Sequence, residues 1–228
     1  MKTLSVFAAI LVMAAPAFAQ REHGYVEGLG GFAVSASAPT ASVRAGNAGV
    51  EAGIGIAPHL QLFANAGRYN DLSPGTVQQT LTDTTTALAS NDALDVVGSA
   101  RMPAKYMTGG LRWEVPVRGR ASPFVLGGMG FARLTPTLSF IYTDGTLPNA
   151  DPSMSPPAVG ADVTQPIELA GLFSQPAPST EFMTTLGGGV DVNVAKHWTV
   201  DSAYRFSRIA ADTPLHAQGL TFGFGYRF

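Results

Sequence analysis

Large apolar residues alternate with small or charged residues along most of this chain, and this period-two pattern limits the fold more than any other feature. It is clearest in the last nine residues, LTFGFGYRF, where threonine, two glycines and an arginine separate the apolar positions. Successive side chains of a β-strand point to opposite faces of a sheet. The segment therefore predicts a strand with one large apolar face and one face that is small or charged.

Eight segments show this alternation, and turn-forming residues lie between them. They are residues 25–35, 48–56, 60–69, 107–117, 123–134, 182–194, 198–206 and 220–228. In the third and fifth segments the pattern leaves the direction of the side chains open. We expect each of the eight segments to form one strand of an all-β fold.

The connections between these segments alternate in length. Short turns lie at residues 57–59, 118–122 and 195–197, and longer segments lie at about 36–46, 70–104, 135–180 and 210–217. This order predicts an antiparallel up-and-down meander whose two ends differ. An eight-stranded transmembrane β-barrel has this plan, with short periplasmic turns and long extracellular loops.

The charged residues decide between a soluble barrel and a membrane barrel. They share their alternate positions with glycine, while the aromatic residues occupy the other positions. Eight strand charges facing lipid would cost on the order of 16–32 kcal/mol, more than the ~5–15 kcal/mol by which a domain is usually stable. The charges must therefore face the barrel interior. They are Glu27, Glu51, Arg112, Glu114, Asp191, Asp201, Arg205 and Arg227.

The N-terminal residues predict an exported protein. A lysine precedes an apolar run that ends in Ala17-Phe18-Ala19, the A-x-A pattern of a signal peptidase site. We expect residues 1–19 to be a cleaved signal peptide and residues 20–228 to form one barrel domain. The chain has no cysteine, which excludes disulfides and thiolate metal sites, and its formal charge of −2 gives no indication of a nucleic-acid partner.

The terminal GLTFGFGYRF, with YVEGLGGF, SPFVLGGMGFARL and YRFSRI before it, resembles the small OmpA/OmpX-type outer-membrane β-barrel family over nearly all of the mature chain. The resemblance implies a protein embedded in the lipid of the bacterial outer membrane. It also implies that the barrel-assembly machinery recognises the C-terminal aromatic residues. In this chain they are Phe222, Phe224, Tyr226 and Phe228.

An eight-stranded barrel has an interior just wide enough to be filled by side chains. Buried charges persist only when they are paired, so we expect Arg112, Arg205 and Arg227 to form ion pairs with the five interior acids. Such a network predicts a structural plug. The alternative is a selectivity gate in a narrow pore that conducts ions or small solutes.

The sequence predicts no catalytic, cofactor-binding or metal-binding residues. Ser207, Asp212 and His216 lie near one another in sequence close to the last long connection. Some outer-membrane barrels carry hydrolytic sites at their outer rim, but the loose spacing of these three residues favours a solvated loop. We therefore expect a non-enzymatic protein.

The two longest connections are the expected sites of surface interaction. In residues 70–104, Val77, Leu81 and Leu88 follow Ser-Pro and predict one face of a short helix, although a mobile polar loop fits equally well. Residues 135–180 are acidic and rich in proline. Their negative charge argues against direct binding of phosphate-rich lipid or nucleic acid by this segment. Four apolar residues in this segment are expected to cap the barrel mouth: Ile167, Leu169, Leu172 and Phe173.

These observations predict a structural anchor that displays residues 70–104 and 135–180 to an extracellular ligand.

Overall fold

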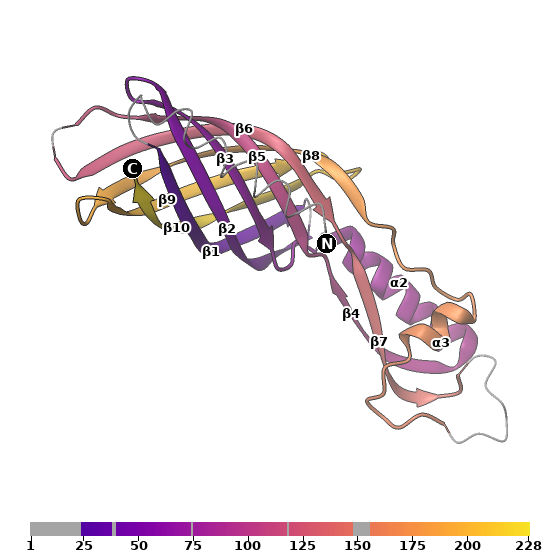
Figure 1. The fold of residues 1–228 in the computed structure, drawn as a ribbon. Helices are drawn as coiled ribbons and strands as arrows, with labels where there is room; N and C mark the ends of the chain where they lie inside the picture. The colour runs from indigo at the N-terminus through magenta and orange to yellow at the C-terminus, as the bar shows by residue number, and fades with distance from the viewer. Residues whose placement is uncertain (1–23, 38–39, 74, 118, 148–155) are drawn as a thin grey trace.

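The computed structural model describes residues 24–37, 40–73, 75–117, 119–147 and 156–228, so the predicted signal peptide lies outside the described residues. Eight strands close into a barrel in the order β1-β10-β9-β8-β6-β5-β3-β2 (Figure 1). They are β1 (Tyr25–Ser37), β2 (Thr40–Ala57), β3 (Leu60–Tyr69), β5 (Ala104–Glu114), β6 (Ala121–Leu134), β8 (Ser179–Asn193), β9 (Trp198–Ile209) and β10 (Leu215–Arg227).

The predicted eight-stranded antiparallel barrel is confirmed. Every neighbouring pair is antiparallel, and the first strand pairs with the last along its length, from Tyr25 opposite Arg227 to Ala36 opposite His216. Closure leaves the barrel no free edge, so the backbone groups of its strands can be paired within hydrocarbon. Among the described residues, no helix has both the length and the apolar character needed to cross a membrane.

The expected loop at residues 36–46 is wrong. β1 runs to Ser37 and β2 begins at Thr40, so the two strands meet in a tight hairpin. Alternation predicts a strand only where its two faces meet different surroundings. A paired strand that extends beyond the bilayer meets no lipid, and its sequence there needs no alternation.

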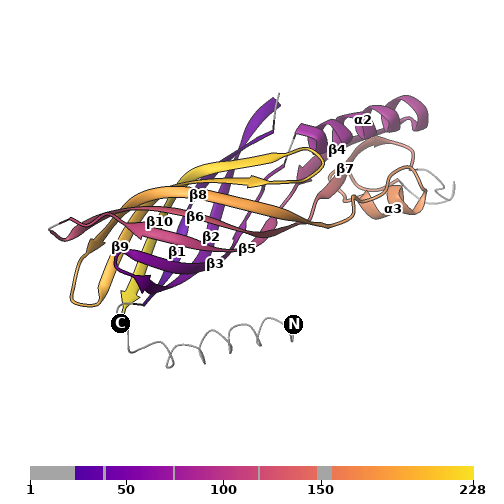
Figure 2. The ribbon, with the colours of Figure 1, turned by 90° about the horizontal axis from the view of Figure 1, so that it is seen from above.

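The two longest connections form a folded arm rather than loops. We use "the arm" for the described residues of 70–103 and 135–178. It consists of α2 (Gly75–Asp92), β4 (Leu94–Arg101), β7 (Thr137–Gly145) and α3 (Thr164–Leu169). Both views show it extending from one end of the barrel, while the short turns and the C-terminus lie at the other end (Figures 1 and 2).

The arm has a hydrophobic core of its own. β4 and β7 form a two-stranded antiparallel sheet, and the other edge of β7 bonds to residues 160–163 through Tyr142 and Phe140. The Gln175 side chain also bonds to Leu138 N–H and C=O. The core residues are Leu81, Leu88, Leu94, Leu138, Phe140, Tyr142, Val163, Ile167 and Phe173.

The structure corrects the prediction for the apolar residues after residue 160. Ile167 and Phe173 are buried in the arm core, where the Phe173 ring packs edge-on against Phe140 at 5.1 Å. Leu169 is 80% exposed and Leu172 is also exposed. These residues do not cap the barrel mouth, because β7 offers them an apolar surface farther out. The helical alternative for residues 70–104 is confirmed, with Leu81 and Leu88 buried.

The third and fifth barrel strands turn some aromatic residues inward. On β3 the interior positions include Phe63 and Asn65, and on β6 they include Phe124 and Leu126. The ring of Phe63 lies over Gly128, where an added Cβ would come within 3.0 Å of it. A glycine on one strand thus makes room for a large side chain from another strand.

Candidate functional site in the barrel interior

All eight predicted interior charges lie in the lumen of the barrel. They come from six of its strands: Glu27 (β1), Glu51 (β2), Arg112 and Glu114 (β5), Asp191 (β8), Asp201 and Arg205 (β9), and Arg227 (β10) are placed there by inward-facing register positions. We call these eight residues the charge network. The most accessible of them, Arg227, keeps only 20% of its side chain exposed.

Arg112 is the centre of the charge network and is completely buried. Its Nη2 donates to Asp191 Oδ2 at 2.9 Å. Its Nη1 lies 3.7 Å from Glu27 Oε1 and 3.7 Å from Glu51 Oε1. The guanidinium also lies 3.8 Å from the ring centroid of Phe124, a cation–π distance. One arginine therefore holds carboxylates from three other strands.

The two other arginines extend the network towards the two ends of the lumen. Arg227 Nη2 donates to Glu114 Oε1 and to Asp191 Oδ2, both at 2.7 Å. Arg205 Nη1 donates to Glu51 Oε2 at 2.7 Å. Each arginine therefore has at least one short charge-assisted bond, as a buried charge requires.

Neutral residues that the sequence analysis did not single out complete this network. Tyr25 Oη donates to Glu51 Oε1 at 2.8 Å, and Asn65 Nδ2 donates to Glu51 Oε2 at 2.9 Å. Gln61 Nε2 donates to Glu114 Oε1 at 3.2 Å. Their signal in the sequence was position: Tyr25 shares the alternate positions of Glu27, two residues away.

Two of the five acids lack a short bond to an arginine. Asp201 is 1% exposed, and neither carboxylate oxygen has a hydrogen-bond partner among the described residues. In the part of the chain that the structure describes, the only ionic contact of Glu27 is the one with Arg112 at 3.7 Å. These two acids lie on the strands that flank β10, opposite its Gly223 and Gly225. The surplus of carboxylates over arginines is therefore concentrated over the glycines of the last strand.

Apolar side chains fill the lumen on the side of the arm. We call this cluster the lumen plug. It consists of Ala33, Ala45, Tyr69, Leu72, Met102, Ala104, Ala132, Leu134, Met183, Ile209, Leu215 and Ala217. Leu72 and Met102 belong to the base of the arm, and Leu72 N–H bonds to Met102 C=O at 2.8 Å. The plug therefore joins the arm to the barrel.

A small polar cavity separates the lumen plug from the charge network. Asn65, Thr108, Thr185, Arg205 and Ser207 are among its lining residues. Its volume is about 10 Å³, which is at the lower limit for a single water molecule. The cavity is far smaller than an aqueous channel.

The residues considered for catalysis do not form a site. Ser207 faces the lumen, where its hydroxyl bonds to Thr185 Oγ1 at 3.2 Å. His216 lies opposite Arg208 rather than Ser207 and stacks on Phe206 with a centroid distance of 5.6 Å. Neighbouring positions of a strand face opposite sides, so Ser207 and His216 are separated by the barrel wall.

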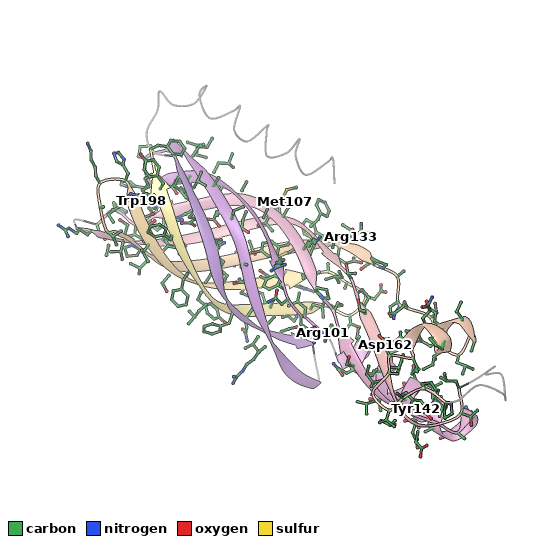
Figure 3. The ribbon with its side chains drawn as sticks, turned by 60° about the horizontal axis from the view of Figure 1, so that its bottom comes forward. Arg101, Met107, Arg133, Tyr142, Asp162 and Trp198 are labelled. Carbon is green, nitrogen blue, oxygen red and sulfur yellow. The ribbon has the colours of Figure 1, made fainter. Side chains whose placement is uncertain are left out.

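The C-terminal aromatic residues lie on the outer face of the barrel. Phe222, Phe224, Tyr226 and Phe228 are all exposed. The ring of Trp198 stacks on Phe224 at 5.0 Å and meets Tyr226 edge-on at 5.4 Å. Trp198 lies at the end remote from the arm (Figure 3), where aromatic girdles of membrane barrels contact the bilayer interface. Recognition of these residues by the assembly machinery stays a prediction.

The closed strand order, apolar outer face and charged lumen define a transmembrane β-barrel of the outer-membrane type. The chain matches the model of the outer membrane protein beta-barrel domain family over residues 5–228 and belongs to that family. The family places the chain in the bacterial outer membrane. No curated protein sequence matches the chain.

Solved structures share this fold. Neisserial surface protein A is 14% identical, with 91% of this chain and 100% of that chain covered and a TM-score of 0.56. A major outer membrane protein from Thermus thermophilus is 9% identical, with 91% and 100% covered and a TM-score of 0.52. The attachment invasion locus protein Ail of Yersinia pestis also matches and is 12% identical, with 91% and 100% covered and a TM-score of 0.49.

Proposed function

We propose that the barrel is a closed, non-enzymatic anchor and that the protein acts through its arm, which binds a ligand outside the cell. The observation that carries this proposal is the lumen plug, because the same apolar side chains block the barrel and fix the arm to it. An anchor needs a rigid junction of this kind, whereas a pore needs an open one.

The lumen argues against the alternative, a narrow channel gated by the interior charges. A solute passing through would have to displace completely buried residues in two successive layers, first Leu215 and Met183 and then Arg112. The cavity between the layers holds about one water molecule at most. The charge network accordingly supports a structural role.

The arm supports a role in surface interaction. It has a core, so its outer residues are held in defined positions, and some of these are apolar. Leu169 is 80% exposed and Val159 is 75% exposed. Binding residues are often found on segments that a rigid scaffold holds out into solvent. The proposed ligand contacts lie within residues 70–104 and 135–180.

Single-channel recording of the refolded protein in a planar bilayer tests this function. We expect no discrete conductance steps from protein whose folding is shown by heat-modifiable gel mobility. Co-flotation of the protein with lipid vesicles of the same composition as the bilayer serves as the control for insertion. Reproducible steps from the unaltered protein, abolished by heat unfolding, would contradict the closed anchor and support the channel.

A further inference from the structure

Three basic side chains lie side by side on the outer wall of the barrel, close to the arm. Arg68 on β3 is directly opposite Lys105 on β5, and Lys105 is directly opposite Arg133 on β6. All three are exposed. We call them the basic row. Figure 3 shows Arg133 between Met107 of the barrel and the labelled residues of the arm.

The basic row has no partner in the described part of the protein. No hydrogen bond or ion pair involves any of the three side chains there. The nearest acid on the next strand, Glu181, lies opposite Ala132 and shares its interior-facing positions, while Arg133 lies opposite Thr180. Like charges directly opposite each other destabilise a sheet. The described part of the protein supplies no anion that offsets this repulsion.

The register is what separates these residues from other outward arginines. Arg44 lies opposite Val34, and Arg208 lies opposite Thr184 and His216. Neither has a lysine or arginine directly opposite it. Within the described barrel strands, only the basic row places three such charges on consecutive strands, which are about 4.8 Å apart.

An apolar surface begins directly below the basic row. Two residues along each strand from the row lie Ala66, Met107 and Phe131, at a separation of about 7 Å. Met107 is 54% exposed and Phe131 is 60% exposed. The Phe131 ring packs edge-on against Phe182 at 6.0 Å. The row therefore lies where the lipid-facing band ends on the side of the arm.

We propose that the basic row binds the phosphate groups of an anionic lipid in the leaflet on the arm side. Arginine presents a planar fork of donors that matches phosphate oxygens, and lysine adds a point charge between the two forks. The acyl chains of the lipid lie along Met107 and Phe131. Free phosphate would use the cations but not this apolar surface, so the site selects a lipid.

The basic row lies apart from residues 135–180, the segment whose negative charge disfavours phosphate binding. The acids of residues 135–180 belong to the arm, and Asp162 lies farther out than Arg133 along the molecule (Figure 3). The basic row belongs to the barrel wall. Repulsion from the acids of the arm therefore does not decide binding at the row.

Native mass spectrometry of the detergent-solubilised full chain tests the proposal, with bis-phosphorylated lipid A as the titrated probe. The test variant is Arg68→Gln with Arg133→Gln. The matched control is Arg120→Gln with Lys196→Gln, which removes the same charge from exposed residues at the opposite end. We expect the test variant to bind about thirty-fold more weakly and the control to bind within about twofold of the unaltered protein.

Two further probes make the result specific. Dephosphorylated lipid A should bind the unaltered protein as weakly as the test variant binds the intact lipid, and inorganic phosphate should not compete with the lipid. The proposal would be overturned if the test variant bound lipid A as tightly as the unaltered protein, or if the control variant lost as much affinity as the test variant. It would also be overturned if the unaltered protein bound dephosphorylated lipid A as tightly as intact lipid A, or if inorganic phosphate competed effectively with the lipid. If the double variant does not fold, Lys105→Gln should show a smaller loss of the same kind.

Discussion

The barrel and the arm are stabilised in opposite ways. In the barrel, charged side chains such as Arg112 and Glu51 are buried, while Phe224 and Phe131 are exposed on the outer face. In the arm, apolar residues such as Phe140 form the core, while charged residues such as Asp83 and Glu168 are exposed. The barrel is surrounded by lipid and the arm by water, so the hydrophobic effect drives apolar residues away from the outer surface of the arm but not from the lipid-facing surface of the barrel. The same chain therefore follows two patterns of hydrophobicity, one for each solvent.

The lumen plug lies at the boundary between these two patterns. It is apolar like the core of the arm, although barrel strands supply most of its residues. Moving from the short turns to the arm, the interior changes from ion pairs to hydroxyl groups and then to aliphatic side chains. The comparison predicts that substitutions in the barrel interior destabilise the barrel, whereas substitutions in the core of the arm unfold the arm alone.

The largest effect is expected for Arg112→Ala. The substitution leaves Asp191, Glu27 and Glu51 with weakened or missing compensation inside the barrel. Breaking a buried ion pair costs about 3–5 kcal/mol, and Arg112 should lie at the upper end. The urea midpoint of the folded band on an unheated gel measures it. An unchanged midpoint would mean that the lumen does not depend on its ion pairs.

Phe140→Ala should unfold the arm and leave the barrel folded. Phe140 is completely buried and packs on Phe173, and truncation of a buried phenylalanine costs about 3–5 kcal/mol. Limited proteolysis should cut the arm rapidly, while the heat-modifiable mobility of the barrel persists. Val97→Ala, at an exposed position of the same sheet, is the control. Loss of the barrel together with the arm would show that the two regions fold as one.

Within the barrel, neutralising a paired carboxylate should lower the free energy of unfolding more than neutralising an unpaired one. Asp191→Asn removes a charge that bonds to two arginines, and we expect it to destabilise the barrel by about 3 kcal/mol. Asp201→Asn removes a buried charge that has no hydrogen-bond partner among the described residues. Its effect should stay within about 1 kcal/mol or be stabilising. If the two variants lost equal stability in urea unfolding, the assignment of Asp191 as paired and Asp201 as unpaired would be contradicted.

The smallest effect on stability is expected from protonation of Asp162 in the arm. Hydrogen bonds from the side chain and backbone N–H of Thr164 hold the pKa of Asp162 below its ordinary value. Because the pKa is lowered in the folded state, the stabilisation is complete above the ordinary value and is lost as the pH falls through the folded-state pKa.

Proteolysis of the arm between about pH 5 and pH 3 measures this effect, a range that spans the ordinary pKa of an aspartate. The unaltered arm should become slightly more sensitive at the acid end, whereas the arm of an Asp162→Asn variant should show a smaller change. Identical pH profiles for the two proteins would remove Asp162 from the account.

The barrel could be predicted from the sequence because lipid imposes a strict alternation on its strands. Arg227, between two aromatic residues that face lipid, has only one direction left for its side chain. The inward direction of Phe63 could not be predicted, because it depends on Gly128 of another strand. The individual ion pairs likewise depend on register between distant strands, such as that of Arg112 with Asp191.

The arm was harder to predict, for two reasons. α2 has the sequence GTVQQTLTDTTTALASND, and threonine is a weak helix former. Packing decides the outcome, since Leu81 fits over Gly98 of β4. β7 was missed for a second reason: Leu138, Phe140 and Tyr142 alternate with Ser139, Ile141 and Thr143, and the apolar Ile141 weakens the difference between the two faces.

Hydrogen–deuterium exchange of the refolded protein in lipid nanodiscs tests the central claim most directly. We predict that barrel amides exchange only when the whole barrel unfolds. The amides of Phe140, Tyr142 and Val163, which bond within the arm, should be protected as a second unit with a lower free energy of opening. Exchange of these arm amides at the rate of an unstructured peptide would contradict the account, because the barrel would then anchor no folded arm.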